Sequence, residues 1–423
     1  MSGIDFCPLY PKQQNHISMS AIIPKTFHRH GDPINSAFFE DYAGKIMHDR
    51  DQSGLTNLID RIVALMIAVE PNHAQSYIAE LCLMTSYHYI FSYQSDQFLT
   101  HVLRINSDQP DILIREPLTN HSNDIFKTIN EQFPVGSKTP HSRYLGEIML
   151  VKDTEAVVAL QKERGIRFFS KEQNLDMDMP TDCVLTKPSP YTHNLLGYRQ
   201  STTHVGYMLG KPFVSADIDK TSRDIKAIQK DIGITPLLGF IDHLATRVYS
   251  QNREAALLEW LTLSSYYYWG SYEIKPQNSS TNVTKSVHYD NERFSPAKVF
   301  TAAKTPYFLN HLHKTPSPTE QFVRDYGPRL HHLAISVCDG ITNKKSNIDF
   351  LVDTLKNQGQ TFLLDVVGSP SEGIQQIFST PSRYSSIIIE YVQRFSDFNG
   401  FFTRENVSEL TRAAGTDPNL SDQ

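Results

Sequence analysis

The 423-residue chain is poor in cysteine: only Cys7, Cys82, Cys183 and Cys338 occur, far apart and without a Cys-x-x-Cys pair. So few thiols exclude a disulfide-framed secreted domain and fit a reducing compartment, so we expect a cytoplasmic protein. The N-terminal region has no basic segment followed by a sustained apolar stretch, which argues against a secretory signal.

Long apolar runs and an excess of positive charge are also missing. No stretch of about 18 apolar residues is present to span a bilayer. The formal net charge is −6 and no dense basic cluster occurs, so neither a membrane nor a nucleic acid is an expected partner. Because no Gly-x-Gly-x-x-Gly, Walker or Gly-x-Ser-x-Gly motif is found, nucleotide binding and serine-hydrolase chemistry have no support.

What is present is a strand–helix–strands order that occurs four times. The copies begin with strand-like runs at 58–67, 144–151, 240–249 and 329–337, each followed by a helical pattern. Paired units that curve small sheets around a shared cleft predict an α+β fold with two domains. The expected parts are a partly helical N-terminal extension at 1–55, domains at 56–215 and 236–415, a linker at 216–235 and a tail at 416–423.

Two histidines occupy matching places in the third and fourth copies. His243 and His332 each begin a His-Leu-Ala tripeptide. Strict strand alternation puts His243 on one face with Ile241 and Ala245, and it puts His331 on the face opposite His332. In the first two copies the matching residues are read as Arg61 and Glu147, which offer no imidazole pair, so we expect that domain to hold no metal.

A carboxylate completes the pattern. Glu390 lies in an otherwise apolar strand, and a buried carboxylate without a partner costs several kcal/mol, on the order of a lost ion pair. Such a residue usually pairs with a cation or a metal, and Arg394, four residues on, is the alternative partner. Two histidines and one carboxylate form the ligand set of a non-haem iron(II) site with open positions.

The same residues resemble a known family. The segment 375–381 with 387–394 resembles the C-terminal signature of the 4-hydroxyphenylpyruvate dioxygenase family, and 240–243 and 327–334 resemble its two histidine strands. The resemblance implies the vicinal-oxygen-chelate fold of paired βαβββ modules, an Fe(II) held by His243, His332 and Glu390, a 2-oxo acid and O2 as substrates, and a possible homodimer. It further implies pocket roles for Gln376, Asn310 and Phe378.

Other pocket positions depart from the family. His331 replaces a glutamine, Ile388 replaces a phenylalanine, and Val407 and Thr411 replace phenylalanines of the C-terminal helix. We therefore expect a dioxygenase that decarboxylates a 2-oxo acid other than 4-hydroxyphenylpyruvate and oxidises the substrate's own side chain. A 4-hydroxyphenylpyruvate dioxygenase, a hydroxymandelate synthase-type hydroxylase, an extradiol ring-cleaving dioxygenase and a non-enzymatic ligand-binding paralogue remain alternatives.

Overall fold

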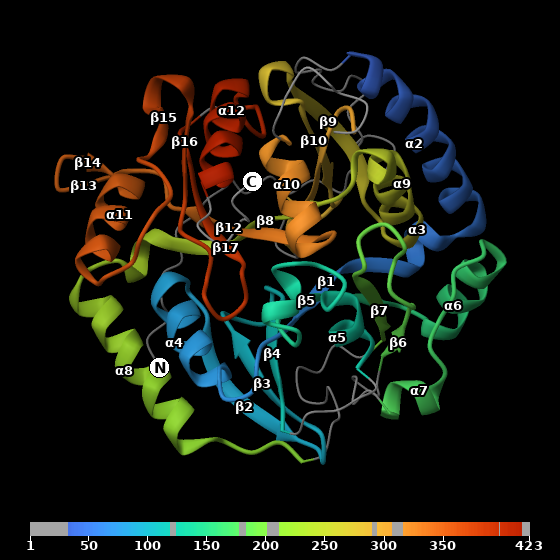
Figure 1. Ribbon diagram of the computed structural model, residues 1–423, viewed down its shortest axis with the longest axis horizontal. Helices are drawn as coiled ribbons and strands as arrows, with labels where there is room; N and C mark the ends of the chain where they lie inside the picture. The colour runs from blue at the N-terminus through green and yellow to red at the C-terminus, as the bar shows by residue number, and fades with distance from the viewer. Residues whose placement is uncertain are drawn as a thin grey trace.

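The protein is built from two curled mixed sheets surrounded by helices, as the computed structural model in Figure 1 shows. The predicted α+β class with paired modules is confirmed. The residues that the structure describes are 33–118, 124–176, 183–200, 211–289, 294–306, 316–396 and 398–416.

The first half of the chain forms a seven-stranded sheet with the strand order β2-β3-β4-β1-β5-β7-β6. Its central strands β1 and β5 pair antiparallel, and β4 and β7 flank them in parallel. The elements are α2 (Pro33–Ser53), α3 (Leu55–Leu58), β1 (Ile59–Ala68), α4 (Ala74–Met84), β2 (His88–Gln94), β3 (Phe98–Arg104), β4 (Asp111–Pro117), α5 (Ile125–Asn130), β5 (Arg143–Val151), α6 (Thr154–Glu163), α7 (Lys171–Asp176), β6 (Val184–Leu185) and β7 (Leu195–Arg199).

The second half forms an eight-stranded sheet with the order β15-β16-β17-β12-β8-β11-β10-β9, beside the small β13-β14 hairpin. Here β8 and β12 are the central antiparallel pair, flanked in parallel by β11 and β17. The elements are α8 (Ala216–Asp231), β8 (Leu238–Arg247), α9 (Arg253–Leu263), β9 (Tyr267–Ile274), β10 (Ser279–Lys285), β11 (Ala297–Ala303), α10 (Pro318–Tyr326), β12 (Arg329–Val337), β13 (Ile341–Thr342), β14 (Lys345–Ser346), α11 (Asn347–Asn357), β15 (Val367–Ser369), β16 (Ile374–Phe378), β17 (Ile388–Arg394) and α12 (Arg404–Ala413).

The segments 166–169, 286–289 and 362–365 are strand-like in sequence, which predicts three further strands, but the structure forms no strand there. Around 166–169 and 362–365 only isolated bridges form, and 286–289 follows the end of a strand instead of forming one. The strands β7 and β10 were not predicted. The sequence of β10 is Ser-Ser-Thr-Asn-Val-Thr-Lys, which has no apolar alternation although most of the strand is buried.

The two sheets repeat each other in detail. The pairing of β1 with β5 and that of β8 with β12 are irregular at matching places, where one strand has an extra residue with no partner on the other. The extra residue Val63 of β1 matches Asp242 of β8, and Leu145 of β5 matches His331 of β12. These β-bulges define which residues of the two halves are equivalent, and they add a residue to the inner face of each strand.

The helices that precede the two halves each stabilise the end of a helix. Arg50 of α2 donates to the carbonyls of Leu261 in the last turn of α9 and of Ser264 and Tyr266 just after it, at 2.7, 2.5 and 2.8 Å. Gln229 of α8 likewise donates to the carbonyls of Leu83 in the last turn of α4 and of Thr85 just after it. Figure 1 shows α2 beside α9 and α8 beside α4. Helix α2, the described part of the predicted extension, therefore packs against the second half.

No helix in the described ranges is both long enough and apolar enough to cross a membrane.

Candidate metal centre

Three strands of the eight-stranded sheet bring the predicted ligands together. His243 lies on β8, His332 on β12 and Glu390 on β17, and the ligand atoms all lie within 4.8 Å of one another. Glu390 Oε2 is 3.0 Å from His243 Nε2 and 3.2 Å from His332 Nε2. Both His243 and Glu390 are fully buried. Among the described residues this is the one group of three such side chains with a metal-site arrangement.

The polar atoms that face one another are consistent with a bound metal ion. Apart from the close contacts among the three ligand side chains, His243 Nε2 and Glu390 Oε2 are buried and have no hydrogen-bond partner, and a shared cation would satisfy both. Two ligand atoms that bind one metal at about 2.1 Å and at right angles are about 3 Å apart. The observed separations match that spacing, so the residues fit a two-histidine, one-carboxylate metal site.

β-Bulges place a second residue next to each histidine ligand. Asp242 Oδ1 is 2.7 Å from His243 Nδ1, and His331 Nδ1 is 2.8 Å from His332 Nδ1. The prediction that His331 faces away from His332 is wrong, because the bulge interrupts the alternation. Ile241 and Ala245, which were predicted to share a face with His243, lie in different hydrophobic clusters for the same reason. Ile241 packs in the cluster that contains the residues of α4 and α9, whereas Ala245 packs in the cluster that contains Phe401 and Phe402.

The contacts at Nδ1 leave the Nε2 atom of each ring directed at Glu390. Such outer partners fix the tautomer and orientation of a ligand imidazole. Asp242 is itself held by Tyr289, whose hydroxyl donates at 2.9 Å, and by Arg394. Arg394 therefore pairs with Asp242, and the alternative reading, in which it neutralises Glu390, is wrong.

Charges around the site act differently on the two histidines. Burial opposes protonation of His243, but the carboxylates of Glu390 and Asp242 outweigh it and raise its pKa to about 8. Burial, with the neighbouring His243 and Arg247, holds the pKa of His332 well below its ordinary value. Burial also opposes ionisation of Asp242, yet the Arg394 guanidinium keeps the pKa of that carboxyl far below its ordinary value. His332 is thus a neutral, ligand-competent imidazole.

A short relay connects the third ligand to the C-terminal helix. Gln376 of β16 donates to Glu390 Oε1 at 2.6 Å, and Asn406 of α12 donates to Gln376 Oε1 at 3.0 Å. All three side chains are buried. The relay occupies one carboxylate oxygen of Glu390 and leaves the other for the ligand position.

The cavity beside the ligands contains four of the predicted pocket residues: Gln376, Phe378, His331 and Val407. Its volume, counted with the part that opens to solvent, is about 450 Å³. Ile388 does not line it, but packs behind it with Phe378 and Leu410. Asn310 lies outside the described residues. Sequence reasoning missed other lining residues, which come from β8, β10, β11 and α12 or the segment before it: Arg247, Thr281, Thr301, Phe402 and Leu410.

Aromatic rings surround the ligands more closely than the predicted loss of phenylalanines suggests. The ring centroid of Phe402 lies 5.2 Å from that of His243, and that of Phe378 lies 4.8 Å from that of His332. Phe401 lies 5.5 Å from His243 on another side. The pair Phe401-Phe402 precedes α12 and was not singled out, although two adjacent aromatic residues before an amphipathic helix are a usable signal.

The equivalent positions of the seven-stranded sheet offer no ligand side chain. When the registers of the two sheets are matched, Ala64 is equivalent to His243, Gly146 to His332 and Gly197 to Glu390. The prediction that Arg61 and Glu147 are the equivalents of the two histidines is therefore wrong. Arg61 lies several residues from Ala64 along β1, and Glu147 lies one residue from Gly146 along β5. A β-carbon on Gly146 would lie 1.9 Å from the carbonyl oxygen of Leu195, so backbone fills this space.

Comparison with known proteins gives a match in structure and none in sequence. No protein-family model matches the chain, and no curated protein matches it. A triple mutant of 4-hydroxymandelate synthase from Streptomyces coelicolor superposes with a TM-score of 0.57 at 14% identity, covering 84% of this chain and 98% of that one.

Two further structures superpose less well. A xylose isomerase-like TIM barrel/4-hydroxyphenylpyruvate dioxygenase fusion protein gives a TM-score of 0.48 at 14% identity, covering 84% of this chain and 52% of that one. BphC, a halotolerant catechol dioxygenase, gives a TM-score of 0.43 at 10% identity, covering 82% of this chain and 92% of that one. At such scores these two add nothing to the fold assignment. The synthase match and the paired modules show that this chain has the vicinal-oxygen-chelate fold, as a divergent example of it.

Proposed function

We propose that the protein is an iron(II)-dependent dioxygenase that decarboxylates a 2-oxo acid with O2 and oxidises the substrate's own side chain. The observation that carries this proposal is the convergence of His243 Nε2, His332 Nε2 and Glu390 Oε2 on one buried point. Three ligands on one side of an ion leave positions open for a chelating substrate and for O2. The fold shared with 4-hydroxymandelate synthase is consistent with it.

An iron(II) ion bound at this point would supply the open coordination positions and the electron needed to activate O2. The protein's own part is to hold the ligands and to shape the space beside them. Asp242 and His331 fix the ring orientations of the two histidines, and Gln376 fixes the carboxylate of Glu390. The rings of Phe378 and Phe402 exclude water from the cavity and offer faces for an apolar side chain.

The cavity also supports a substrate other than 4-hydroxyphenylpyruvate. Val407 and Thr411 of α12 line it where the family resemblance implies phenylalanines. Each missing aromatic contact forfeits about 0.5–1.5 kcal/mol of stacking with a phenol ring. We therefore propose an aliphatic or small side chain on the 2-oxo acid in preference to a hydroxyphenyl group.

The test is anaerobic reconstitution with Fe(II), followed by O2 uptake and CO2 release across a panel of 2-oxo acids that includes 4-hydroxyphenylpyruvate. We expect one O2 consumed per CO2 released, because both oxygen atoms enter the product. The fastest substrate should not be 4-hydroxyphenylpyruvate. O2 uptake on catechols without CO2 would favour the ring-cleaving alternative, and no uptake with any substrate would favour the non-enzymatic one.

A further inference from the structure

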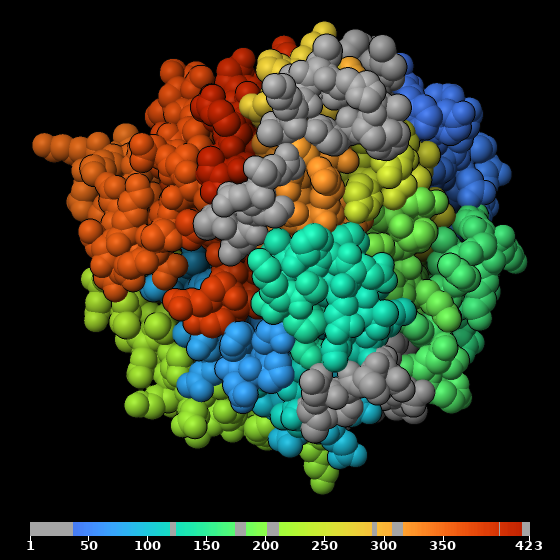
Figure 2. Space-filling model, viewed as in Figure 1, coloured from blue at the N-terminus to red at the C-terminus, as the bar shows by residue number. Residues whose placement is uncertain are grey.

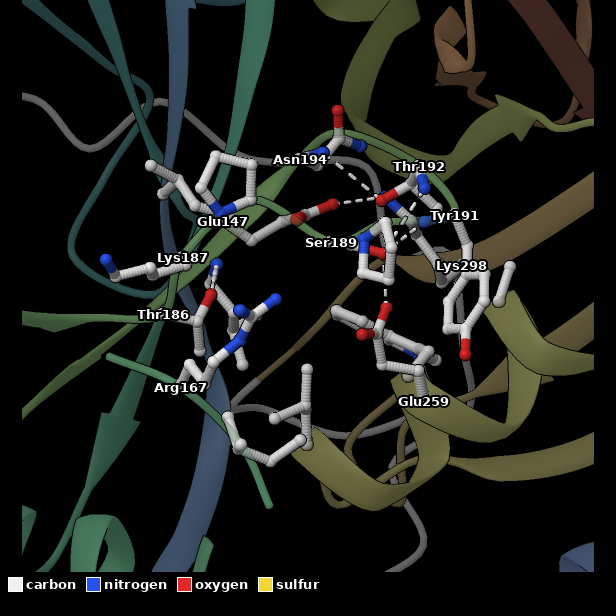
Figure 3. A pocket seen from close by; sticks show the side chains of 18 of the residues that line it. Glu147, Arg167, Thr186, Lys187, Ser189, Tyr191, Thr192, Asn194, Glu259 and Lys298 are labelled. Carbon is white, nitrogen blue, oxygen red and sulfur yellow. Dashed lines mark hydrogen bonds and ion pairs between the residues drawn. The ribbon is translucent and has the colours of Figure 1, made fainter. Parts of the chain in front are cut away.

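A second cavity, larger than the one beside the metal ligands, lies where the two halves of the molecule meet (Figure 3). Its volume, counted with the part that opens to solvent, is about 830 Å³. One wall comes from β5 and the segment around β6 and β7 in the first half. The opposite wall comes from α9 and β11 in the second half.

An ion pair between the two halves forms part of the wall of this cavity. Lys298 of β11 pairs with Glu147 of β5, and both side chains are buried. The ammonium of Lys298 also lies 5.4 Å from the centre of the Trp260 ring. These groups neutralise each other, so they shape the cavity without giving it a net charge.

Three other polar groups that line the cavity lack a complementary partner. The described structure gives the guanidinium of Arg167 no hydrogen bond and no ion pair. Glu259 accepts only the hydroxyl of Ser189, and no cation lies within ion-pair distance among the described residues. The indole N–H of Trp260 is buried and has no acceptor, in a residue that is 6% exposed.

Arg167 is exposed to solvent and Glu259 is half-buried, whereas the Trp260 indole N–H is buried without an acceptor, which is unusual in a folded protein. Burial raises the pKa of Glu259 to about 7, so the carboxylate is held there at a cost. In Figure 3 Arg167 and Glu259 lie on different sides of the cavity, whereas the side chain of Lys187 extends away from it. The cavity therefore has a half-buried acidic group on one side and a solvent-exposed basic group on another, in a space that is open to solvent.

We propose that this cavity is a second ligand site, and that it binds an α-amino acid in its zwitterionic form. The ligand's ammonium group would pair with Glu259 and its carboxylate with Arg167, with the Trp260 indole N–H as a further donor to the carboxylate. A ligand with only one of the two charges leaves one protein group unsatisfied. The site is separate from the metal centre, since none of its lining residues lines the cavity beside His243 and His332.

The test is isothermal titration of the metal-free full-length protein with each of the common L-amino acids. The best binder is then compared with the 2-oxo acid and the primary amine that carry the same side chain. We expect one amino acid bound per chain. We also expect binding about tenfold or more weaker for the 2-oxo acid and the amine, since each lacks one charge-assisted pair.

Variants assign the binding to this cavity. Glu259→Gln and Arg167→Gln should each weaken it about tenfold or more, while Lys187→Gln, the matched control, should leave it unchanged. Ser189→Ala provides a second probe of the same carboxylate if Glu259→Gln folds poorly. His332→Ala should retain full binding, which separates this site from the metal centre.

The proposal is overturned if no amino acid binds, or if the 2-oxo acid or the amine binds as tightly as the amino acid. It is also overturned if Glu259→Gln and Arg167→Gln leave the affinity unchanged, or if His332→Ala abolishes it.

Discussion

The residue directly before each histidine ligand decides how that histidine is held. Asp242 and His331 both reach the inner face through a β-bulge, and both contact the Nδ1 atom of the following ring. The partners differ in kind, because Asp242 is a carboxylate anchored by Arg394, whereas His331 is an imidazole. We expect the charged partner to contribute more to metal affinity.

The substitution Asp242→Asn tests the contribution of the Asp242 carboxylate to metal affinity. The amide keeps the size of the side chain but removes the charge that orients His243 and balances Arg394. Metal affinity should fall about 10–100-fold, as for other outer-shell carboxylates, while the fold is retained. Anaerobic Fe(II) titration measures the change, with Asp353→Asn at an exposed position as the control. Equal affinities for the two variants would mean that Asp242 does not hold the ligand.

At this scale the sequence predicts the ligand types well and the local geometry poorly. His243, His332 and Glu390 stand out because a histidine or a carboxylate in an apolar strand needs a partner. The places of Asp242 and His331 could not be predicted, since a bulge shifts the alternation by one residue and leaves no compositional mark. Equivalents in the first half were misread for the same reason.

At the scale of elements, helix α2 is a structural part of the second half. Its Arg50 donates three hydrogen bonds to carbonyls in and just after the last turn of α9, at a position that is 3% exposed. Carbonyls in the last turn of a helix have no partner within the helix. The strand β12 was predicted with its observed bounds, but the role of α2 was not, because a weakly amphipathic helix gives no sign of what it packs on.

Arg50→Gln should therefore destabilise the protein by about 2–4 kcal/mol, since a buried charged donor is lost and carbonyls are left unsatisfied. Urea unfolding of the full chain measures this as a lower midpoint. Lys45→Ala, on the exposed side of the same helix, should change stability by less than about 0.5 kcal/mol. A midpoint for Arg50→Gln that equals that of Lys45→Ala would contradict the assigned role.

At the scale of the whole molecule, the two halves share a buried contact that responds to pH. Glu80 of α4 in the first half is hydrogen-bonded to Ser382 between β16 and β17, and burial raises its pKa to about 7 from 4.5. The folded carboxyl therefore binds its proton more tightly than the unfolded one. Its contribution to stability is complete below about pH 4.5 and is lost as the pH rises through about 7.

Glu80→Gln should accordingly flatten the decline of Tm between about pH 5 and pH 8 and raise Tm at pH 8. Glu259 has the same shift and sign, so part of the decline should persist. Thermal unfolding across that pH range checks the prediction. A profile for Glu80→Gln that is parallel to that of the unchanged protein would show that Glu80 titrates normally.

The repeated strand–helix–strands order predicts the paired architecture, because four segments with the same sequence pattern are expected to form four similar modules. The exchange of helices between halves could not be predicted, since α2 and α8 read as an extension and a linker. The contacts that place these helices, such as those of Arg50 and Gln229 with helix ends, join residues far apart in the sequence.

We propose that His243, His332 and Glu390 hold one metal ion. Anaerobic Fe(II) titration of the metal-free protein, followed by calorimetry, tests this most directly. We expect about one ion per chain, no tight binding in His243→Ala, His332→Ala or Glu390→Ala, and thermal stabilisation by iron only in the unchanged protein. Iron binding that is absent from the unchanged chain, or equally tight in Glu390→Ala, would contradict it.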